Sequence, residues 1–185
     1  MKLTITKREH KGKASVKQAR RDGDVPAVMY SSGKSCEMIL VNGTELGTIL
    51  REMKSGLLPT TVFELEMDGK VRRAIIKDIQ YDVTSYRVTH IDFEELFDGT
   101  PVHVKVPIQC AGTGDCVGVK LGGFLRQVIR FVKVECLPQS IPQSFSVDVR
   151  NLGIRQSKRL SDIAFPQGVR PLAPLQEVVV VVAKR

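Results

Sequence analysis

Hydrophobic and polar residues alternate along much of the first ninety residues with the two-residue period of half-buried β-strands. Leu3 and Ile5, for example, alternate with threonines, which predicts a strand with one face in the core. The strands expected after it cover residues 27–30, 36–41, 62–67, 71–80 and 86–93, with a turn at residues 31–34. Asp68 and Gly69 separate two of these strands and are typical of a two-residue hairpin loop.

One stretch has the spacing of an amphipathic helix instead. Four apolar residues recur there at positions i, i+3, i+4 and i+7, which places them on one helical face. These residues are Leu46, Ile49, Leu50 and Met53. Asn42 or Thr44 is suited to cap the start of this helix, and Gly56 is expected to close it. We assign the four apolar residues to the core.

The second half of the chain is predicted to be almost entirely strands. The expected strands cover residues 102–108, 128–136, 145–149 and 177–183, with a short element at 160–164. The glycine-rich segment 112–123 is expected to be irregular, and prolines throughout this half disfavour long helices. An acidic, turn-like joint at residues 94–99 marks the expected boundary, so we predict a mainly β protein with domains at 1–95 and 96–185.

Positive charge is concentrated at the start of the chain. The 185 residues carry 28 Lys and Arg against 20 Asp and Glu. Residues 1–95 have 16 basic and 14 acidic side chains, with the excess crowded into residues 1–30, and residues 96–185 have 12 and 6. A short helix is expected in the basic segment, from Lys13 or Ser15 to just before Gly23. Such a segment indicates a polyanionic partner, or else a merely solvated basic arm.

Other features of the composition narrow the class of protein. Tryptophan is absent and aromatic residues make up 5% of the chain, which disfavours base stacking as the main recognition device. The four cysteines form no CxxC pair, so we expect reduced, mostly buried thiols and no metal site. No signal peptide is apparent, and the longest apolar run, residues 178–183, is much shorter than the roughly 18 residues of a membrane span. We therefore expect a soluble, cytoplasmic protein that does not bind membranes.

The motifs that would indicate catalysis are incomplete. Residues 112–118 contain three glycines, but their spacing is wrong for a dinucleotide site and they lack the Gly-Lys-Ser/Thr of an ATPase loop; a flexible hairpin loop is expected there. Ser85, His90 and Asp92 are the residue types of a hydrolase, yet no nucleophile elbow accompanies them. We expect no enzymatic activity and no cofactor.

Three polar residues are better explained by binding. His90 and Asp92 lie two apart on one predicted strand, so they share a face, and Gln80 closes the preceding strand. Side by side, they offer donors and acceptors suited to base edges and 2′-hydroxyls of RNA. An ordinary polar sheet face is the alternative explanation.

These residues belong to a set of motifs that resembles a known family. The motifs in the first half are residues 12–13, 17–20, 22–23, 25–30, 68–70, 78–80 and 90–93, and those in the second half are 102–107, 118–123, 136–138, 141–142 and 147–149. In this order they resemble the bacterial large-subunit ribosomal protein L-twenty-five, and over the whole chain its long form, the general stress protein CTC family.

The resemblance implies a structural protein of the large ribosomal subunit that binds 5S rRNA. Its first domain would be a small β-barrel with short helices, docked on the minor groove of an internal loop. By motif, phosphates and sugars would be contacted by Arg8, Lys13, Lys17 and Arg20. The minor-groove side of non-standard base pairs would be reached by Tyr30, Gln80, His90 and Asp92. The all-β second domain would contact neighbouring ribosomal components, and the free protein is expected to be a monomer.

The chain departs from the family pattern at several positions. Lys17 stands where an arginine is usual, which removes a bidentate contact. Gln18 and Ala19 replace a basic residue and a leucine, residues 31–32 replace a glycine, and residues 81–82 replace a His-Pro pair. The alternatives to a ribosomal role are an RNA-binding stress protein acting mainly off the ribosome and, from another class, a small hydrolase.

Overall fold

The computed structural model describes residues 1–9, 12–31, 35–67 and 69–184. The chain forms two compact units, Met1–Thr100 and Pro101–Arg185, which are described separately below. Most of the predicted turn at residues 31–34, and Asp68 of the predicted hairpin loop, lie outside the described residues. Among the residues that are described, no helix has the length and apolar character needed to cross a lipid bilayer.

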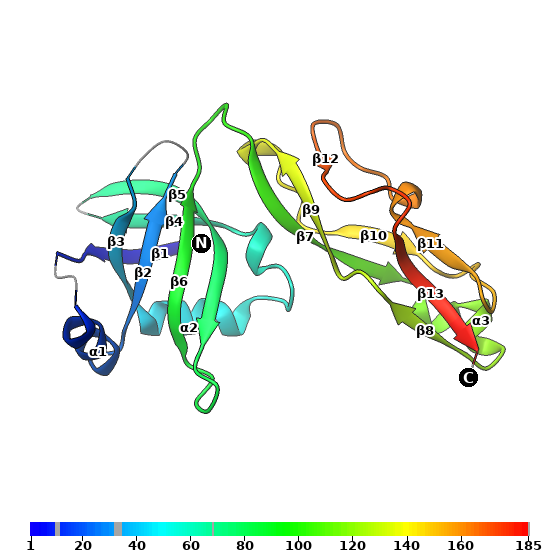
Figure 1. Cartoon of the computed structure of the whole chain (residues 1–185), viewed down its shortest axis with the longest axis horizontal. Helices are drawn as coiled ribbons and strands as arrows, with labels where there is room; N and C mark the ends of the chain where they lie inside the picture. Colours follow the sequence, from blue (N-terminus) through cyan, green and yellow to red (C-terminus); the bar gives the residue numbers. More distant parts are fainter. Residues whose placement is uncertain (10–11, 32–34, 68, 185) are drawn as a thin grey trace. The chain divides into compact units, whose positions relative to one another are not determined.

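The first unit is a closed barrel of six strands (Figure 1). Around the barrel the order is β1, β3, β2, β6, β5, β4, with parallel pairing of β1 to β4 and of β2 to β6. The strands are β1 (Lys2–Lys7), β2 (Asp24–Tyr30), β3 (Glu37–Asn42), β4 (Val62–Met67), β5 (Lys70–Tyr81) and β6 (Val88–Glu95). The expected class, mainly β with a barrel in the first half, is confirmed.

The interior of the barrel is filled by the apolar residues of the alternating pattern. Leu3 and Ile5 of β1 are 1% and 3% exposed, which confirms the predicted half-buried strand. Phe63 and Phe93 meet at the centre, edge to face, with ring centroids 6.3 Å apart. This arrangement is one of those that aromatic pairs prefer. The outward-facing positions on the same strands are therefore left for polar residues.

Helix α2 (Gly43–Glu52) packs against the barrel core through the predicted stripe, of which Leu46 is 1% exposed. The Asn42 side chain caps its start by accepting hydrogen bonds from the backbone N–H groups of Thr44 and Glu45. The predicted end at Gly56 is wrong. The helix stops earlier because Met53 is already extended, and Gly56 adopts its left-handed φ of 88° in the turn that follows. A 3-10 turn, η1 (Leu58–Thr60), leads into β4.

Helix α1 (Lys13–Asp22) occupies the predicted basic segment. It ends at Gly23, whose φ of 95° is a left-handed conformation that suits glycine, and whose N–H donates to the Ala19 carbonyl. Ala19 is buried, so this small side chain is on the side of α1 that faces the barrel. The helix leads directly into β2, which ties its orientation to the sheet.

The boundaries of β6 differ from the prediction at both ends. Tyr86 was expected within the strand, but its φ of 54° places it in the turn between β5 and β6. Glu94 and Glu95, expected in a turn, are the last residues of the strand. They are held there by neighbouring cations on β5: Lys77 Nζ lies 2.7 Å from Glu94, and Arg72 Nε lies 3.8 Å from Glu95.

The second unit consists of two sheets, with orders β10-β7-β9-β12 and β11-β13-β8. The strands are β7 (Val102–Ala111), β8 (Gly123–Gln127), β9 (Phe131–Cys136), β10 (Phe145–Asp148), β11 (Ser157–Arg159), β12 (Arg170–Pro171) and β13 (Val178–Lys184). The short helices are η2 (Thr113–Asp115), α3 (Val117–Lys120), η3 (Pro138–Ser140) and η4 (Leu160–Asp162). The valine-rich β13 is paired on both sides, which removes an edge that would otherwise aggregate.

Two predictions for the second unit are wrong. The strand expected at 128–136 begins only at Phe131, and residues 128–130 form a bend between β8 and β9. The Gln127 side chain stabilises this bend by donating to the carbonyls of Ile108 and Ile129. The glycine-rich segment is no flexible hairpin loop but contains η2 and α3. Gly118 lies in α3, where its N–H donates to the Leu152 carbonyl at 2.8 Å, and a Cβ there would come within 3.0 Å of the surrounding atoms. Gly118 is therefore packed among its neighbours and is not available to a phosphate.

All four cysteines are free thiols. Cys116 and Cys136 are buried, Cys110 is half-buried and Cys36 is exposed. Burial raises the pKa of the Cys110 and Cys136 thiols, which keeps both uncharged near neutral pH. Within the described part of the chain no group of three or more His, Cys, Asp or Glu residues is arranged to hold a metal ion.

Candidate nucleic-acid interface

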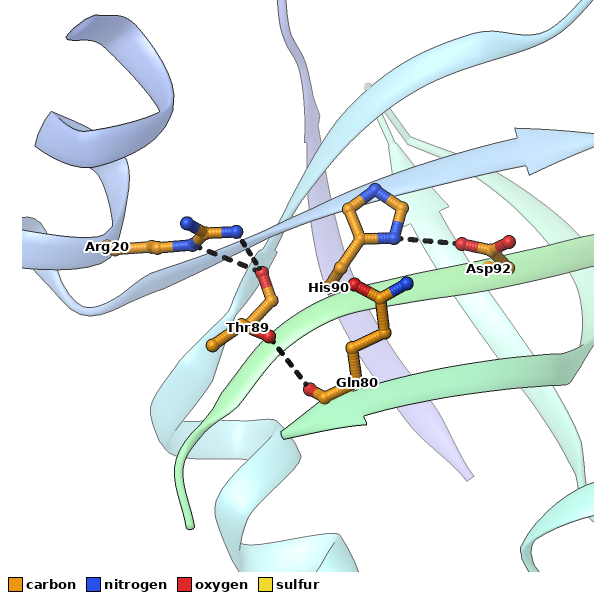
Figure 2. A network of polar contacts seen from close by, with 5 residues as sticks. All are labelled: Arg20, Gln80, Thr89, His90 and Asp92. Carbon is orange, nitrogen blue, oxygen red and sulfur yellow. Dashed lines mark hydrogen bonds and ion pairs between the residues drawn. The ribbon is translucent and has the colours of Figure 1, made fainter. Parts of the chain in front are cut away.

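The outer surface of β2, β6 and β5 gathers the polar residues that the motifs single out. The register pairs Gln80 of β5 with His90 of β6, and Asp78 with Asp92. On the other side of β6, the parallel strand β2 places Val28 beside Asp92. Since alternate residues face the same side of a strand, these side chains project together from the barrel (Figure 2). We call Tyr30, Gln80, His90 and Asp92 the sheet face.

His90 and Asp92 form a hydrogen-bonded pair on the sheet face. His90 Nδ1 lies 2.8 Å from Asp92 Oδ1, and the two side chains are 26% and 34% exposed. The Nδ1–H group donates to the carboxylate, which fixes the orientation of the ring. Nε2 then lies on the side of the ring away from Asp92 (Figure 2). The pair presents an imidazole nitrogen and a carboxylate oxygen in defined positions.

Arg20 connects helix α1 to the sheet face. Its Nε and Nη2 donate to the Thr89 carbonyl at 3.1 and 2.8 Å. The Thr89 hydroxyl in turn donates to the Gln80 carbonyl at 3.2 Å. This chain of contacts (Figure 2) holds the guanidinium next to Gln80 and His90. The Nη1 group points away from Thr89, in a position to donate to a ligand.

Lys13 and Lys17 lie on the same side of α1 as Arg20, because the three residues are spaced i, i+4 and i+7. All three are exposed. We call them the α1 stripe. Within the described residues, neither lysine forms an ion pair, so their charge is available to an external anion.

Arg8 lies at the end of β1, where its N–H donates to the Met38 carbonyl at 3.0 Å. Its side-chain Nε and Nη1 atoms are buried, and no residue in the described ranges accepts a hydrogen bond from either. Buried N–H groups of a guanidinium without an acceptor are costly to the fold.

Tyr30 closes β2 in register with Glu94 of β6. Burial raises the pKa of its hydroxyl above 10.0, and the charges of Glu94, Asp92 and Asp78 raise it further. The phenol therefore stays protonated at neutral pH and remains able to donate a hydrogen bond.

The raised pKa of Tyr30 is directly testable because the chain has three tyrosines. In the double variant Tyr81→Phe/Tyr86→Phe, ultraviolet absorbance should report Tyr30 alone, with a titration midpoint above 10.0. Adding Glu94→Gln should lower the midpoint. The pKa of Tyr30 is higher in the folded than in the unfolded chain, so its protonated hydroxyl contributes to stability. That contribution is complete at a pH below the pKa of the unfolded chain, and it is lost as the pH rises through the pKa of the folded chain. A midpoint at or below 10.0 would contradict the burial of this hydroxyl.

The structure adds two acidic residues to the surface that the sequence did not assign to it. Asp78 lies opposite Asp92, and Glu94 lies in register with Tyr30. Asp78 is two residues before Gln80, so its place on the same face could have been predicted from the period of the strand. Glu94 was excluded by the expected turn. Asp78 and Asp92 thus make the centre of the surface acidic, Glu94 is paired with Lys77, and the α1 stripe is basic.

The residues suggested for a hydrolase are not brought together. Ser85 lies in the turn between β5 and β6, where its hydroxyl donates to Asp82 Oδ1 at 2.9 Å. His90 is hydrogen-bonded to Asp92 instead. A catalytic triad requires the nucleophile to be hydrogen-bonded to the base, and that contact is not made between Ser85 and His90.

Both units have counterparts in known proteins. Residues 3–93 match the Ribosomal L25p family, and residues 101–185 match the family described as ribosomal protein TL5, C-terminal domain. Large ribosomal subunit protein bL25 of Chlamydia caviae is 49% identical over 185 residues, the full length of both chains. The proteins of the same name from Chlamydia abortus and Chlamydia pneumoniae are 49% and 45% identical over the same length.

The resemblance drawn from the motifs is thus confirmed over the whole chain. The matched family consists of structural ribosomal proteins and not of enzymes, in agreement with the separation of Ser85 from His90. Both halves are present, as in the long form of the family. The chain belongs to the bL25 family of large ribosomal subunit proteins.

Proposed function

We propose that this large-subunit protein binds an internal loop of 5S rRNA through its barrel. The observation that carries the proposal is the junction of the sheet face with the α1 stripe. There, Arg20 is fixed by the Thr89 carbonyl, next to the His90–Asp92 pair. Groups suited to phosphates and groups suited to base edges are therefore held on one rigid surface.

The distribution of charge indicates which part of the RNA lies where. Carboxylates repel phosphates but accept hydrogen bonds from the amino groups of bases. Asp78 and Asp92 at the centre of the surface are therefore expected to face base edges. The cationic flanks, Arg8 and the α1 stripe, are expected to hold the phosphates and sugars on either side.

A minor groove fits this arrangement better than a major groove. In A-form RNA the major groove is too deep and narrow for side chains, while the minor groove is wide and shallow and displays 2′-hydroxyls. The Tyr30 hydroxyl, the Gln80 amide and the His90–Asp92 pair supply both donors and acceptors to such a surface. Non-standard base pairs would present the irregular edges that distinguish the loop from plain duplex.

The two domains have different roles in this proposal. Residues 1–95 form the RNA-binding domain, and residues 96–185 form a second β-domain that contacts neighbouring components of the subunit. The second domain carries 12 basic and 6 acidic residues, which suits an anionic surface. The protein is a monomer when free and works at the ribosome.

Footprinting tests the proposal. The full chain should protect a single internal loop of a 5S rRNA transcript from hydroxyl radicals, and its affinity should fall steeply with salt as phosphate contacts release counterions. A plain RNA duplex of equal length is the control. Equal affinity for both RNAs, or no protected loop, would refute the proposed function.

A further inference from the structure

The turn between β5 and β6 exposes apolar side chains that the sheet face does not use. Val83 and Tyr86 are 89% and 80% exposed, and Tyr81 is 47% exposed. Large apolar side chains this exposed on one short turn are unusual unless they meet a partner. The turn directly adjoins the proposed RNA surface, since Thr89 follows it on β6 and accepts from Arg20.

This turn is rigidly held. The Asp82 carboxylate accepts hydrogen bonds from the N–H groups of Thr84 and Ser85 and from the Ser85 hydroxyl, at 2.7–3.0 Å. The bonds from Ser85 and Thr84 lower the pKa of Asp82, so it is ionised at neutral pH. The Tyr86 N–H donates to the Asp82 carbonyl at 2.9 Å. Tyr86 is thereby kept at a φ of 54°, a conformation that is rare for a bulky residue and often found at functional sites.

A cleft of about 1240 Å³ opens between this turn, the end of α1 and the end of α2. Leu50, Met53 and other apolar residues of this end of the barrel line it. Four cations from three separate parts of the unit also line it: Arg20, Arg51, Lys54 and Arg87. Two carboxylates, Asp24 and Asp82, also line it, so cations are in excess.

We propose that this cleft receives an unpaired nucleotide of the bound RNA, with the base stacked on Tyr86 and its phosphate held by the cations that line the cleft. An aromatic ring beside a cationic groove is the combination that binds single-stranded nucleic acid without regard to sequence. The proposal rests on the proposed function for its RNA. Arg20 borders both the sheet face and the cleft, so an RNA strand that leaves the sheet face passes directly to the cleft.

The charge of the cleft favours RNA over a protein partner. An apolar protein segment would fit the apolar residues of the lining but would desolvate four cations with only two carboxylates to balance them, and desolvating charges without pairing them is unfavourable. A nucleotide matches both kinds of lining residue, because its base covers apolar side chains and its phosphate neutralises the cations. The sparse aromatic content of the chain agrees with a single stacking position and not with an extended platform.

Two probes test the proposal with the full chain: the oligonucleotide hexa-adenylate and a 5S rRNA transcript, each measured by fluorescence anisotropy. Tyr86→Asn removes the ring while asparagine tolerates the left-handed backbone. It should weaken hexa-adenylate binding by about 5- to 10-fold, the lower part of the range for loss of one stacked base. Tyr86→Phe keeps the ring and should bind as the original chain does. Val83→Ser is the matched control, because Val83 is more exposed than Tyr86 but does not line the cleft.

On 5S rRNA, Tyr86→Asn should weaken binding without changing the salt slope, since the ring is uncharged. Arg87→Gln should instead reduce that slope by about 1. Failure of the original chain to bind hexa-adenylate, or equal binding by Tyr86→Asn, would overturn the nucleotide site and point to a protein partner. The original chain could instead bind hexa-adenylate, lose that binding in Tyr86→Asn, and show no recognition of 5S rRNA. That result would keep the cleft as an RNA site and refute only the proposed function.

Discussion

Replacing Asp92 with alanine is expected to reduce the preference for the 5S rRNA loop over plain duplex by about 1–3 kcal/mol, the discrimination of a good bidentate base contact. The substitution removes a carboxylate at the centre of the sheet face and also releases His90, whose Nδ1 lies 2.8 Å from Asp92. Both losses act on base recognition, while the phosphate contacts on the flanks stay in place. Affinities for the two RNAs, measured at one salt concentration, give the difference directly.

The control for Asp92→Ala must account for charge, because removing any carboxylate strengthens binding to a polyanion. Asp148→Ala makes the same change of charge in the second unit, on a side chain that is 65% exposed. It should raise the affinity for both RNAs slightly and equally. If Asp92→Ala changed both affinities by the same factor, Asp92 would have a structural role and no part in base recognition. Thermal unfolding of both variants checks that the barrel remains intact.

The barrel interior was predictable because a strand obeys a strict two-residue period. Once Leu3 and Ile5 were assigned inward, the polar residues between them had to face outward, and the same reasoning placed His90 and Asp92 together. Barrel closure did not follow from this pattern. It depends on the parallel pairing of β1 with β4 and of β2 with β6, which joins segments far apart in the chain; only the family resemblance indicated it.

The errors in element boundaries share one physical cause. Local signals predict a helix that continues to Gly56 and a strand that begins at Val128, but tertiary contacts end the helix at Glu52 and delay the strand to Phe131. Gln127 stabilises the bend after β8 by donating to the carbonyl of Ile129 within the bend and to that of Ile108 on β7, and no feature of the local sequence indicates that contact. Tyr86 is the clearest case, since its left-handed backbone depends on hydrogen bonds to Asp82.

The residues of the sheet face could be found from the sequence, but their contacts could not. A register irregularity between Ile76 and Asp78 sets which β5 residues face outward, and such irregularities leave no clear mark in the sequence. Arg20 was recognisable as a cation near the start of the chain. Arg20 contacts the main-chain carbonyl of Thr89. Every residue has such a carbonyl, so no sequence pattern could predict this contact.

Replacing Arg20 with alanine is expected to cost about 1.5–3 kcal/mol of 5S rRNA affinity, the usual contribution of hydrogen bonds to a charged group. The salt slope of binding should also fall by about 1, because one phosphate contact is lost. Arg20 acts in two ways: its two donors on the Thr89 carbonyl fix α1 against the sheet, and Nη1 remains for the RNA. RNA-binding titrations at several salt concentrations separate the two effects, because the loss of charge changes the salt slope and the displacement of α1 does not.

Arg21 is the matched control, since it is the next residue on α1, is exposed and carries the same charge. If binding depended only on the charge density of the basic segment, Arg21→Ala and Arg20→Ala would have equal effects, and the proposed position of Arg20 would be wrong. Arg20→Lys keeps the charge but cannot place two donors on one carbonyl. It should retain the salt slope and lose part of the affinity, because the cation is still present but is no longer held beside Gln80 and His90.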